Sequence, residues 1–271
     1  MTDQLGWRMK FGVIAPSTNT SVQPEFDDMR PKGVTNHFSR IWIPDDPVAS
    51  DDDFNKLMDN IRAEMDNAIA RVMTCQPDYL VMGMSSETFW GGLAASIELR
   101  ERTEKLSGLR VAMGSDACQA ALKCYGDIRR VAVLTPYWPV GDENVRRFFT
   151  DCGFEVIRLK GLKCNSPVQI AHASEDELRA ALVELDGPDV DAVIQVGTNR
   201  AMARLAGEAD RWFHKPVLAI NTATYWYALR DCGIDDVVEG FGSLLSDHRE
   251  LPDRARPRLE CDRFNLNRFE T

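Results

Sequence analysis

Residues 10–17 read Lys-Phe-Gly-Val-Ile-Ala-Pro-Ser, an apolar run that ends at a proline and leads into the polar loop Thr18-Asn19-Thr20. Residues 130–137, Arg-Val-Ala-Val-Leu-Thr-Pro-Tyr, repeat this order of strand, proline and polar loop. A second pair of segments, 78–85 and 191–198, shares an aspartate, an apolar strand and a small polar turn. Self-similarity at one offset, here about 110–120 residues, is typical of a duplicated structural unit.

The rest of the chain continues this alternation of apolar strands and helical patterns, which predicts βαβ units and parallel sheets. We therefore predict an α/β fold with two pseudo-symmetric Rossmann-like lobes and an active-site cleft between them. The predicted strands lie near residues 10–15, 34–43, 79–83, 110–114, 130–134, 154–160, 191–196 and 217–220. We expect the first lobe to comprise residues 1–115 plus 216–250, the second lobe 116–215, and an extended C-terminal arm 251–271.

Two helices have clear sequence signals. Ser50 and Asp53 have the spacing of an N-cap and its reciprocal carboxylate, and they precede an apolar stripe with helical period. That stripe consists of Phe54, Leu57, Met58, Ile61, Met65, Ala68, Ile69 and Val72. Ser174 and Glu177 form a second predicted capping box, which opens a helix later in the chain.

The composition limits the kinds of partner. The chain has 271 residues and a formal net charge of −10, so it lacks the cationic surface that binds nucleic acid. Residues 1–10 carry no apolar signal segment, and nowhere do about 18 apolar residues follow one another, so we expect a cytoplasmic protein without membrane contact. The seven cysteines and four histidines lack the spacing of a zinc site, and we expect neither metal nor cofactor. The charged segment after Asp247 is typical of an arm ordered by another subunit, which favours a homo-oligomer.

Polar loops follow the predicted strands at the ends where open parallel sheets bind their ligands. Two similar lobes facing each other bring these loops around one cleft. The helix starts there offer backbone N–H groups to a carboxylate or phosphate, although the same side chains also serve as simple helix caps. The candidate ligand-binding residues are Ser17, Asn19, Met84, Ser85, Ser86, Gly197, Thr198, Asn199 and Arg200.

Three residues are candidates for proton transfer or for stabilising an oxyanion. Glu87 follows the third strand, and a carboxyl group in a dry cleft has the raised pKa that a general base needs. Asp116 is a second acid or base, and Tyr137 offers a phenol to an oxyanion. A solvated first-turn carboxylate explains Glu87 and Asp116 equally well, and Tyr137 is also a plausible packing residue.

The segment Gly-Val-Ile-Ala-Pro-Ser-Thr-Asn-Thr, residues 12–20, resembles the opening motif of maleate cis-trans isomerases. Residues 83–92, 134–137, 196–199 and 219–226 are similar to later motifs of that family and of the broader aspartate/glutamate racemase superfamily, over roughly residues 10–245 in total. The resemblance implies that Asn19, Ser85, Tyr137, Thr198 and Asn199 hold a substrate carboxylate.

The resemblance also implies two facing cysteines in maleate isomerases, and one in the related arylmalonate decarboxylases. The matching positions here are Met84 and Gly197, so both thiols are absent. A thioether transfers no proton and glycine has no side chain, so another group must do that work. Cys118 lies nearest to a predicted cleft loop but is expected to pack inward.

These observations favour a cofactor-independent lyase or isomerase that acts on a small carboxylic or dicarboxylic acid through an enolate-like intermediate. Glu87 or Asp116 would move the proton. One alternative is a hydrolase of a small amide or lactone in which Glu87 activates water. The other is a non-catalytic carboxylate sensor. A nucleotide ligand is disfavoured because no glycine-rich phosphate-binding motif follows a strand.

Overall fold

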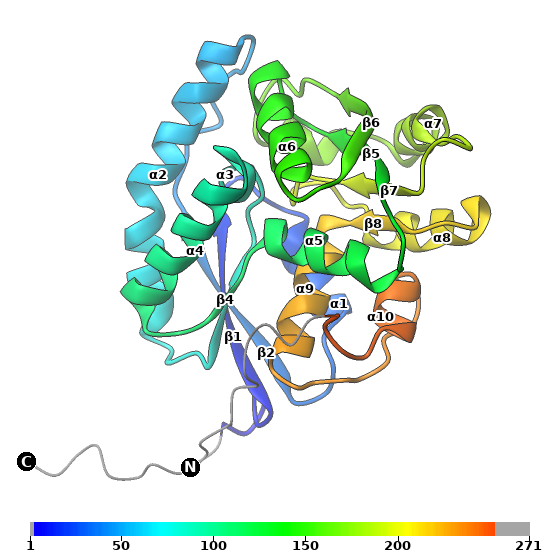
Figure 1. Ribbon diagram of the computed structural model, residues 1–271. Helices are drawn as coiled ribbons and strands as arrows, with labels where there is room; N and C mark the ends of the chain where they lie inside the picture. Colours follow the sequence, from blue (N-terminus) through cyan, green and yellow to red (C-terminus); the bar gives the residue numbers. More distant parts are fainter. Residues whose placement is uncertain (1–2, 253–271) are drawn as a thin grey trace, which may run out of the picture.

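The computed structural model describes residues 3–252 and contains two four-stranded parallel sheets (Figure 1). The strands are β1 (Met9–Pro16), β2 (Val34–Ile41), β3 (Tyr79–Met82), β4 (Val111–Ala112), β5 (Arg130–Thr135), β6 (Glu155–Gly161), β7 (Ala192–Gln195) and β8 (Val217–Ala219). Their order is β2-β1-β3-β4 in the first sheet and β6-β5-β7-β8 in the second, so the predicted repeat and fold class are confirmed. All eight predicted strands are present. Strand β4 is shorter than predicted because a helix begins at Gly114.

Helices cover both sheets. They are α1 (Val22–Asp28), α2 (Asp51–Met73), α3 (Ser86–Phe89), α4 (Gly92–Ser107), α5 (Gly114–Cys124), α6 (Pro139–Asp151), the 3-10 helix η1 (Gln169–His172), α7 (Glu175–Leu185), α8 (Ala203–Phe213), α9 (Ile220–Asp231) and α10 (Ser243–Asp247). None of the helices within residues 3–252 combines the length and apolar character that spanning a lipid bilayer requires. The C-terminal arm predicted for residues 251–271 lies, from residue 253 onward, outside the described residues.

Helix α2 forms as its sequence predicts. The Ser50 hydroxyl accepts a hydrogen bond from the backbone N–H of Asp53 at 3.2 Å, which satisfies one of the free N–H groups of the first turn. Every residue of the predicted apolar stripe is buried except Leu57, which is only partly buried. The second predicted capping box, at Ser174 and Glu177, is also confirmed.

Helix α9 joins the two halves of the molecule. It follows β8 of the second sheet, and it packs on α5 and on strands β3 and β4 of the first sheet (Figure 1). All of its residues are buried, which requires its polar side chains to find partners inside the protein. The carboxyl ends of the strands of both sheets therefore open toward a shared interior.

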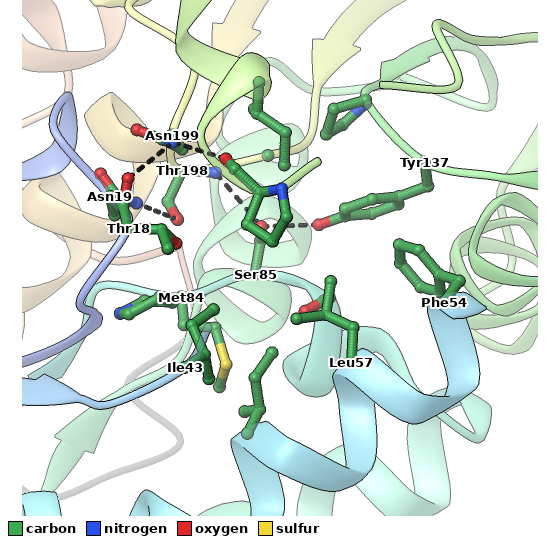
Figure 2. A pocket seen from close by; sticks show the side chains of 17 residues that line it. Thr18, Asn19, Ile43, Phe54, Leu57, Met84, Ser85, Tyr137, Thr198 and Asn199 are labelled. Carbon is green, nitrogen blue, oxygen red and sulfur yellow. Dashed lines mark hydrogen bonds between the residues drawn. The ribbon is translucent and has the colours of Figure 1, made fainter. Parts of the chain in front are cut away.

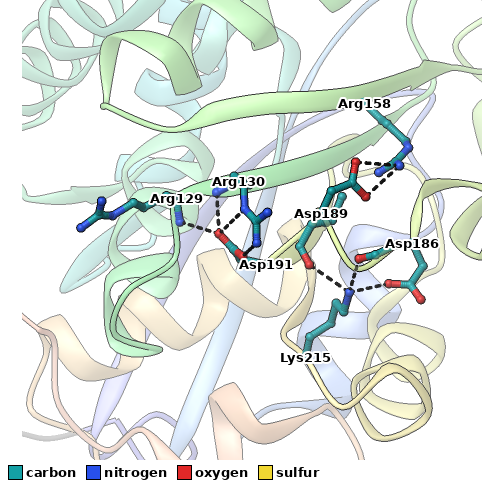
Figure 3. Close-up of polar contacts among 9 residues, drawn as sticks. Arg129, Arg130, Arg158, Asp186, Asp189, Asp191 and Lys215 are labelled. Carbon is teal, nitrogen blue, oxygen red and sulfur yellow. Dashed lines mark hydrogen bonds and ion pairs between the residues drawn. The ribbon is translucent and has the colours of Figure 1, made fainter.

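The strand starts show how closely the halves repeat each other. Asp78, before β3, accepts a hydrogen bond from the backbone N–H of Lys10 at 2.8 Å. Asp191, before β7, accepts the matching bond from Arg130 at 2.8 Å and also pairs with its guanidinium (Figure 3). Arg130 holds the pKa of Asp191 down at about 2. These contacts lie at the edge of each sheet away from the loops, where they fix strand register.

Candidate active site

Four strand-end loops, one each from β1, β3, β5 and β7, surround a cleft that is partly open to solvent. The cleft is lined by Pro16, Thr18, Asn19, Ile43, Phe54, Leu57, Ile61, Met84, Ser85, Ser86, Pro136, Tyr137, Pro167, Ile170, Gly197, Thr198 and Asn199. Eight of the predicted site residues are among them: Asn19, Met84, Ser85, Ser86, Tyr137, Gly197, Thr198 and Asn199. Both halves of the molecule contribute to this lining.

The polar end of the cleft is built around the hydroxyls of Ser85 and Tyr137 (Figure 2). These two oxygens lie 2.6 Å apart and share a hydrogen bond. The Ser85 hydroxyl also accepts a bond from the backbone N–H of Thr198 at 3.2 Å, and the Asn19 amide donates to the Thr198 hydroxyl at 3.0 Å. One hydrogen-bonded group thus links the β1, β3, β5 and β7 loops.

Asn199 holds the β1 and β7 loops together beside this group. Its side-chain oxygen accepts from the backbone N–H of Thr20 at 2.8 Å, and its amide donates to the carbonyl of Pro167 at 2.9 Å. The Ser21 hydroxyl donates to the Asn199 carbonyl at 3.1 Å. The polar side-chain atoms of Asn199 therefore bind other parts of the protein. The hydroxyl groups available to a ligand belong to neighbouring residues.

The opposite wall of the cleft is apolar. Helix α2 contributes Phe54, Leu57 and Ile61, and the loop after β2 contributes Ile43. The Phe54 ring lies 5.4 Å from the ring of Tyr137, so the aromatic wall continues to the polar end. A ligand bound here would place a charged group against hydroxyls and an uncharged group against this wall.

Tyr137 is the one residue with a titratable side chain among the described residues that line the cleft. Its side chain is buried, and burial raises the pKa of the phenol above its ordinary value despite the hydrogen bond to Ser85. The phenol is therefore neutral at physiological pH and a weaker acid than in water, so only a strongly basic acceptor such as an enediolate carbon could take its proton.

The two positions that correspond to the missing thiols are occupied differently, one by a buried methionine and the other by a glycine packed against a proline. Met84 is 2% exposed and lies on the cleft wall. Gly197 has a φ of +125°, and a Cβ there would lie 2.7 Å from both Cδ and Cγ of Pro136. Any side chain at 197 would meet both backbone strain and a steric clash, so a cysteine does not fit this backbone.

Two predicted binding residues lie outside the cleft lining. The Ser17 hydroxyl donates to the carbonyl of Ile43 at 3.2 Å and accepts from its N–H at 3.1 Å, which anchors the loop that carries Ile43. Arg200 is 2% exposed, and its guanidinium donates to the Cys164 sulfur at 3.1 Å. Arg200 is therefore not among the lining residues, and its role as a carboxylate clamp stays a prediction.

The two predicted carboxylate bases also lie outside the lining. Glu87 accepts from Arg62 at 2.8 Å, and burial raises its pKa against the opposing effect of that arginine. Asp116 pairs with Arg100 at 2.8 Å. Helix geometry turns both side chains from the cleft toward these arginines. Cys118 is buried, as predicted, and burial raises its pKa, so it supplies no reactive thiolate.

Sequence reasoning missed two parts of the site. Part of the apolar wall comes from the α2 stripe, whose period predicts a helix but not a ligand-facing surface, and only the position of α2 beside the cleft reveals that role. Glu25 on α1 was also missed. It accepts hydrogen bonds from Ala203 and Asn221, but nothing in the sequence distinguishes it from a surface helix glutamate. In the part of the chain that the structure describes, no three His, Cys, Asp or Glu side chains form a group suited to a metal ion.

Comparison with protein families gives a match over most of the chain. The profile of the family described as "Arylmalonate decarboxylase" matches residues 11–245. A maleate isomerase of Pseudomonas putida (strain KT2440) is 23% identical over 251 residues, which cover 88% of this chain and 97% of that protein.

Solved structures have the same fold. A maleate cis-trans isomerase from Nocardia farcinica superposes with a TM-score of 0.79 at 21% identity, covering 88% of this chain and 98% of that one. That structure is a cysteine-to-serine mutant with a covalently bound succinylcysteine intermediate. An arylmalonate decarboxylase superposes with a TM-score of 0.69 at 18% identity, covering 87% and 98% of the two chains. The similarity confirms the predicted two-lobed fold.

Proposed function

The chain belongs to the arylmalonate decarboxylase family, which groups it with decarboxylases and isomerases, and from that premise we propose that it decarboxylates a malonate bearing a large apolar substituent. The reaction is cofactor-independent and passes through an enolate-like intermediate. The observation that carries this proposal is the Ser85–Tyr137 hydroxyl pair facing an apolar wall in one cleft.

The polar end of the cleft suits a carboxylate that gains charge during the reaction. Hydroxyls of Ser85, Tyr137 and Thr198 converge there, and their framework is already fixed by hydrogen bonds in the protein. Donors that are preorganised in this way stabilise a developing oxyanion more strongly than mobile water does. The retained carboxylate of the substrate would become the enediolate at this position.

The apolar wall, which would hold the substituent, also borders the carboxylate that leaves. Phe54, Leu57, Ile61 and Met84 offer it no hydrogen-bond donor, so the charged carboxylate is poorly solvated there and neutral carbon dioxide is favoured. The carbon–carbon bond breaks, carbon dioxide leaves, and the bonding electron pair remains in the enediolate. Tyr137 then donates its phenolic proton to the central carbon, and the tyrosinate regains a proton from water through Ser85.

Isomerisation of maleate fits this cleft less well. In the Nocardia farcinica relative a cysteine forms a covalent bond to the intermediate, whereas no thiol is present among the described residues that line this cleft. Decarboxylation needs only donors for the oxyanion and one proton donor. Maleate is also a small dianion without an apolar group to occupy the wall formed by α2.

A hydrolase would need a base beside the bound substrate. The predicted base, Glu87, is paired with Arg62 outside the cleft lining, and Tyr137 is too weak an acid to be present as an anion. These contacts argue against a hydrolase. A non-catalytic sensor is one outcome of the test below.

The test is incubation of the purified protein with phenylmalonate, branched alkylmalonates and maleate, monitored by NMR in deuterated water. We expect carbon dioxide release from the malonates with one deuterium on the central carbon of the product, and no conversion of maleate to fumarate. Conversion of maleate alone would overturn the proposal in favour of an isomerase. Binding of malonates without turnover would overturn it in favour of a sensor.

A further inference from the structure

Glu25 is an acidic residue on α1 whose carboxyl group points into the contact between the two halves of the molecule. One carboxylate oxygen accepts from the backbone N–H of Ala203, at the start of α8, at 2.8 Å. The other accepts from the side-chain amide of Asn221, at the start of α9, at 2.6 Å. Burial raises the pKa of Glu25, and these hydrogen bonds oppose that effect.

Asn221 connects Glu25 to a residue that lines the cleft. Its amide nitrogen also donates to the carbonyl of Thr198 at 2.9 Å, so both N–H bonds of that nitrogen have an acceptor. The residue is 1% exposed. If the amide rotated by half a turn, its oxygen would face the Glu25 carboxylate and the Thr198 carbonyl, which are both acceptors. The carboxylate of Glu25 therefore fixes the orientation of the amide.

Thr198 is in turn held at three atoms. Asn221 binds its carbonyl, Asn19 donates to its hydroxyl, and its N–H donates to the hydroxyl of Ser85. A shift of the Thr198 peptide would weaken its bond to Ser85, which is the hydroxyl that pairs with Tyr137.

We propose that Glu25 is a positioning residue that acts through Asn221 and Thr198 to hold the Ser85–Tyr137 pair in place. It does not line the cleft and need not touch substrate. The importance of the pair for catalysis rests on the proposed function, whereas the contact chain from Glu25 to Ser85 does not.

The chemistry of position 25 is specific. A glutamine there would present one N–H donor either to the backbone N–H of Ala203 or to the amide of Asn221, and one of the two bonds would be lost. A glutamine that keeps its oxygen on Asn221 leaves Thr198 undisturbed, so the deciding variant is Glu25→Leu. It removes both acceptors, and the amide of Asn221 then loses the partner that fixes its orientation toward Thr198. Asn221→Ala removes the link to Thr198 but leaves Glu25 bound to Ala203.

The experiment measures hydrogen exchange of individual backbone amides by NMR in the ligand-free, full-length protein. In Glu25→Leu we expect exchange at Thr198 to accelerate by about tenfold or more, since the contact that fixes Asn221 is lost. In Asn221→Ala we expect the same acceleration at Thr198, with Ala203 unchanged. The control is Asp28→Asn on the same helix, where an exposed ion pair with Arg204 is removed and neither amide should change.

A folded Glu25→Leu protein with wild-type exchange at Thr198 would overturn the proposal. If that variant fails to fold, Asn221→Ala decides, and wild-type exchange at Thr198 there would also overturn it. Once a malonate that the protein converts is known, Glu25→Leu should lower kcat by about tenfold and leave KM within about twofold, as loss of alignment rather than of binding predicts. Because the exchange measurement uses no substrate, it remains valid even if the proposed function is wrong.

Discussion

The two halves of the molecule are alike at the starts of their strands and different at the ends. Asp78 and Asp191 make the same backbone hydrogen bonds before β3 and β7, and the strand orders of the sheets are identical. At the other end, β3 leads to Met84 and β7 leads to Gly197. A thioether side chain occupies the first position, and Pro136 fills the space beside the glycine at the second. The contacts at the common edge fix strand register, and the loops at the edge that differs line the cleft.

This difference leaves Tyr137, from the second half, as the one titratable side chain among the described residues that line the cleft. Met84 presents a thioether, and Gly197 presents backbone alone, with Pro136 filling the space beside it. Tyr137, from the loop after β5, takes the place of a thiol as the proton donor that we propose.

The largest expected effect follows from removing that proton. Tyr137→Phe keeps the ring against Phe54 but deletes the hydroxyl, and we expect kcat of malonate decarboxylation to fall by about 100-fold or more. The matched control is Tyr225→Phe, because Tyr225 is also buried and has a raised pKa but bonds to Asn36 away from the cleft. Equal loss in both variants would contradict the proposed role of Tyr137.

The second prediction tests whether the backbone at Gly197 leaves room for a side chain. Gly197→Ala should lower the free energy of unfolding by about 3 kcal/mol, from strain at positive φ together with overlap with Pro136. Gly108→Ala separates the two causes, because Gly108 has a φ of +72° with open space around it, and should cost about 1 kcal/mol. Urea denaturation measures both losses in the free energy of unfolding. Equal losses would show that overlap with Pro136 adds nothing to the cost of a side chain at position 197.

The fold was predictable from sequence because alternating strands, capping residues and the internal repeat are local signals. The loops of the cleft were predictable for the same reason, since ligands bind at the carboxyl ends of parallel strands. The partners of individual side chains were not. Glu87 and Arg62 lie 25 positions apart, and Glu25 and Asn221 lie 196 apart, so only the folded structure shows that the first carboxylate leaves the cleft and the second supports it.

A smaller effect concerns Asp142, which supports the loop of Tyr137 in the second half. It accepts from the Thr135 hydroxyl, which itself accepts from the backbone N–H of Tyr137. Burial raises the pKa of Asp142 from 3.8 to about 6, so the unfolded chain loses this proton at lower pH than the folded protein does. Stability should therefore fall as pH rises from about 4 to about 6, by about 1 kcal/mol given the partial exposure of the residue.

Asp142→Asn should remove that contribution. Denaturation of the two proteins at about pH 4 and about pH 7 measures it, and the stability of the wild type relative to the variant should be lower at the higher pH. A difference that does not change with pH, or changes in the opposite direction, would contradict the assigned shift.

The smallest effect is expected at the two carboxylates outside the lining. Glu87→Gln and Asp116→Asn should each keep kcat within about twofold of wild type, because neither side chain reaches the cleft. A loss of about 100-fold in either variant, with folding intact, would return the proton transfer to the substituted carboxylate.

The most direct test of a single proton donor is the configuration of the product from a malonate that carries an aryl and a methyl group on its central carbon. Protonation by Tyr137 alone delivers hydrogen to one face of the enediolate, so the account predicts one enantiomer of the 2-arylpropionate, measured by chiral chromatography. Racemic acid would contradict the account, because it would require a proton source on both faces.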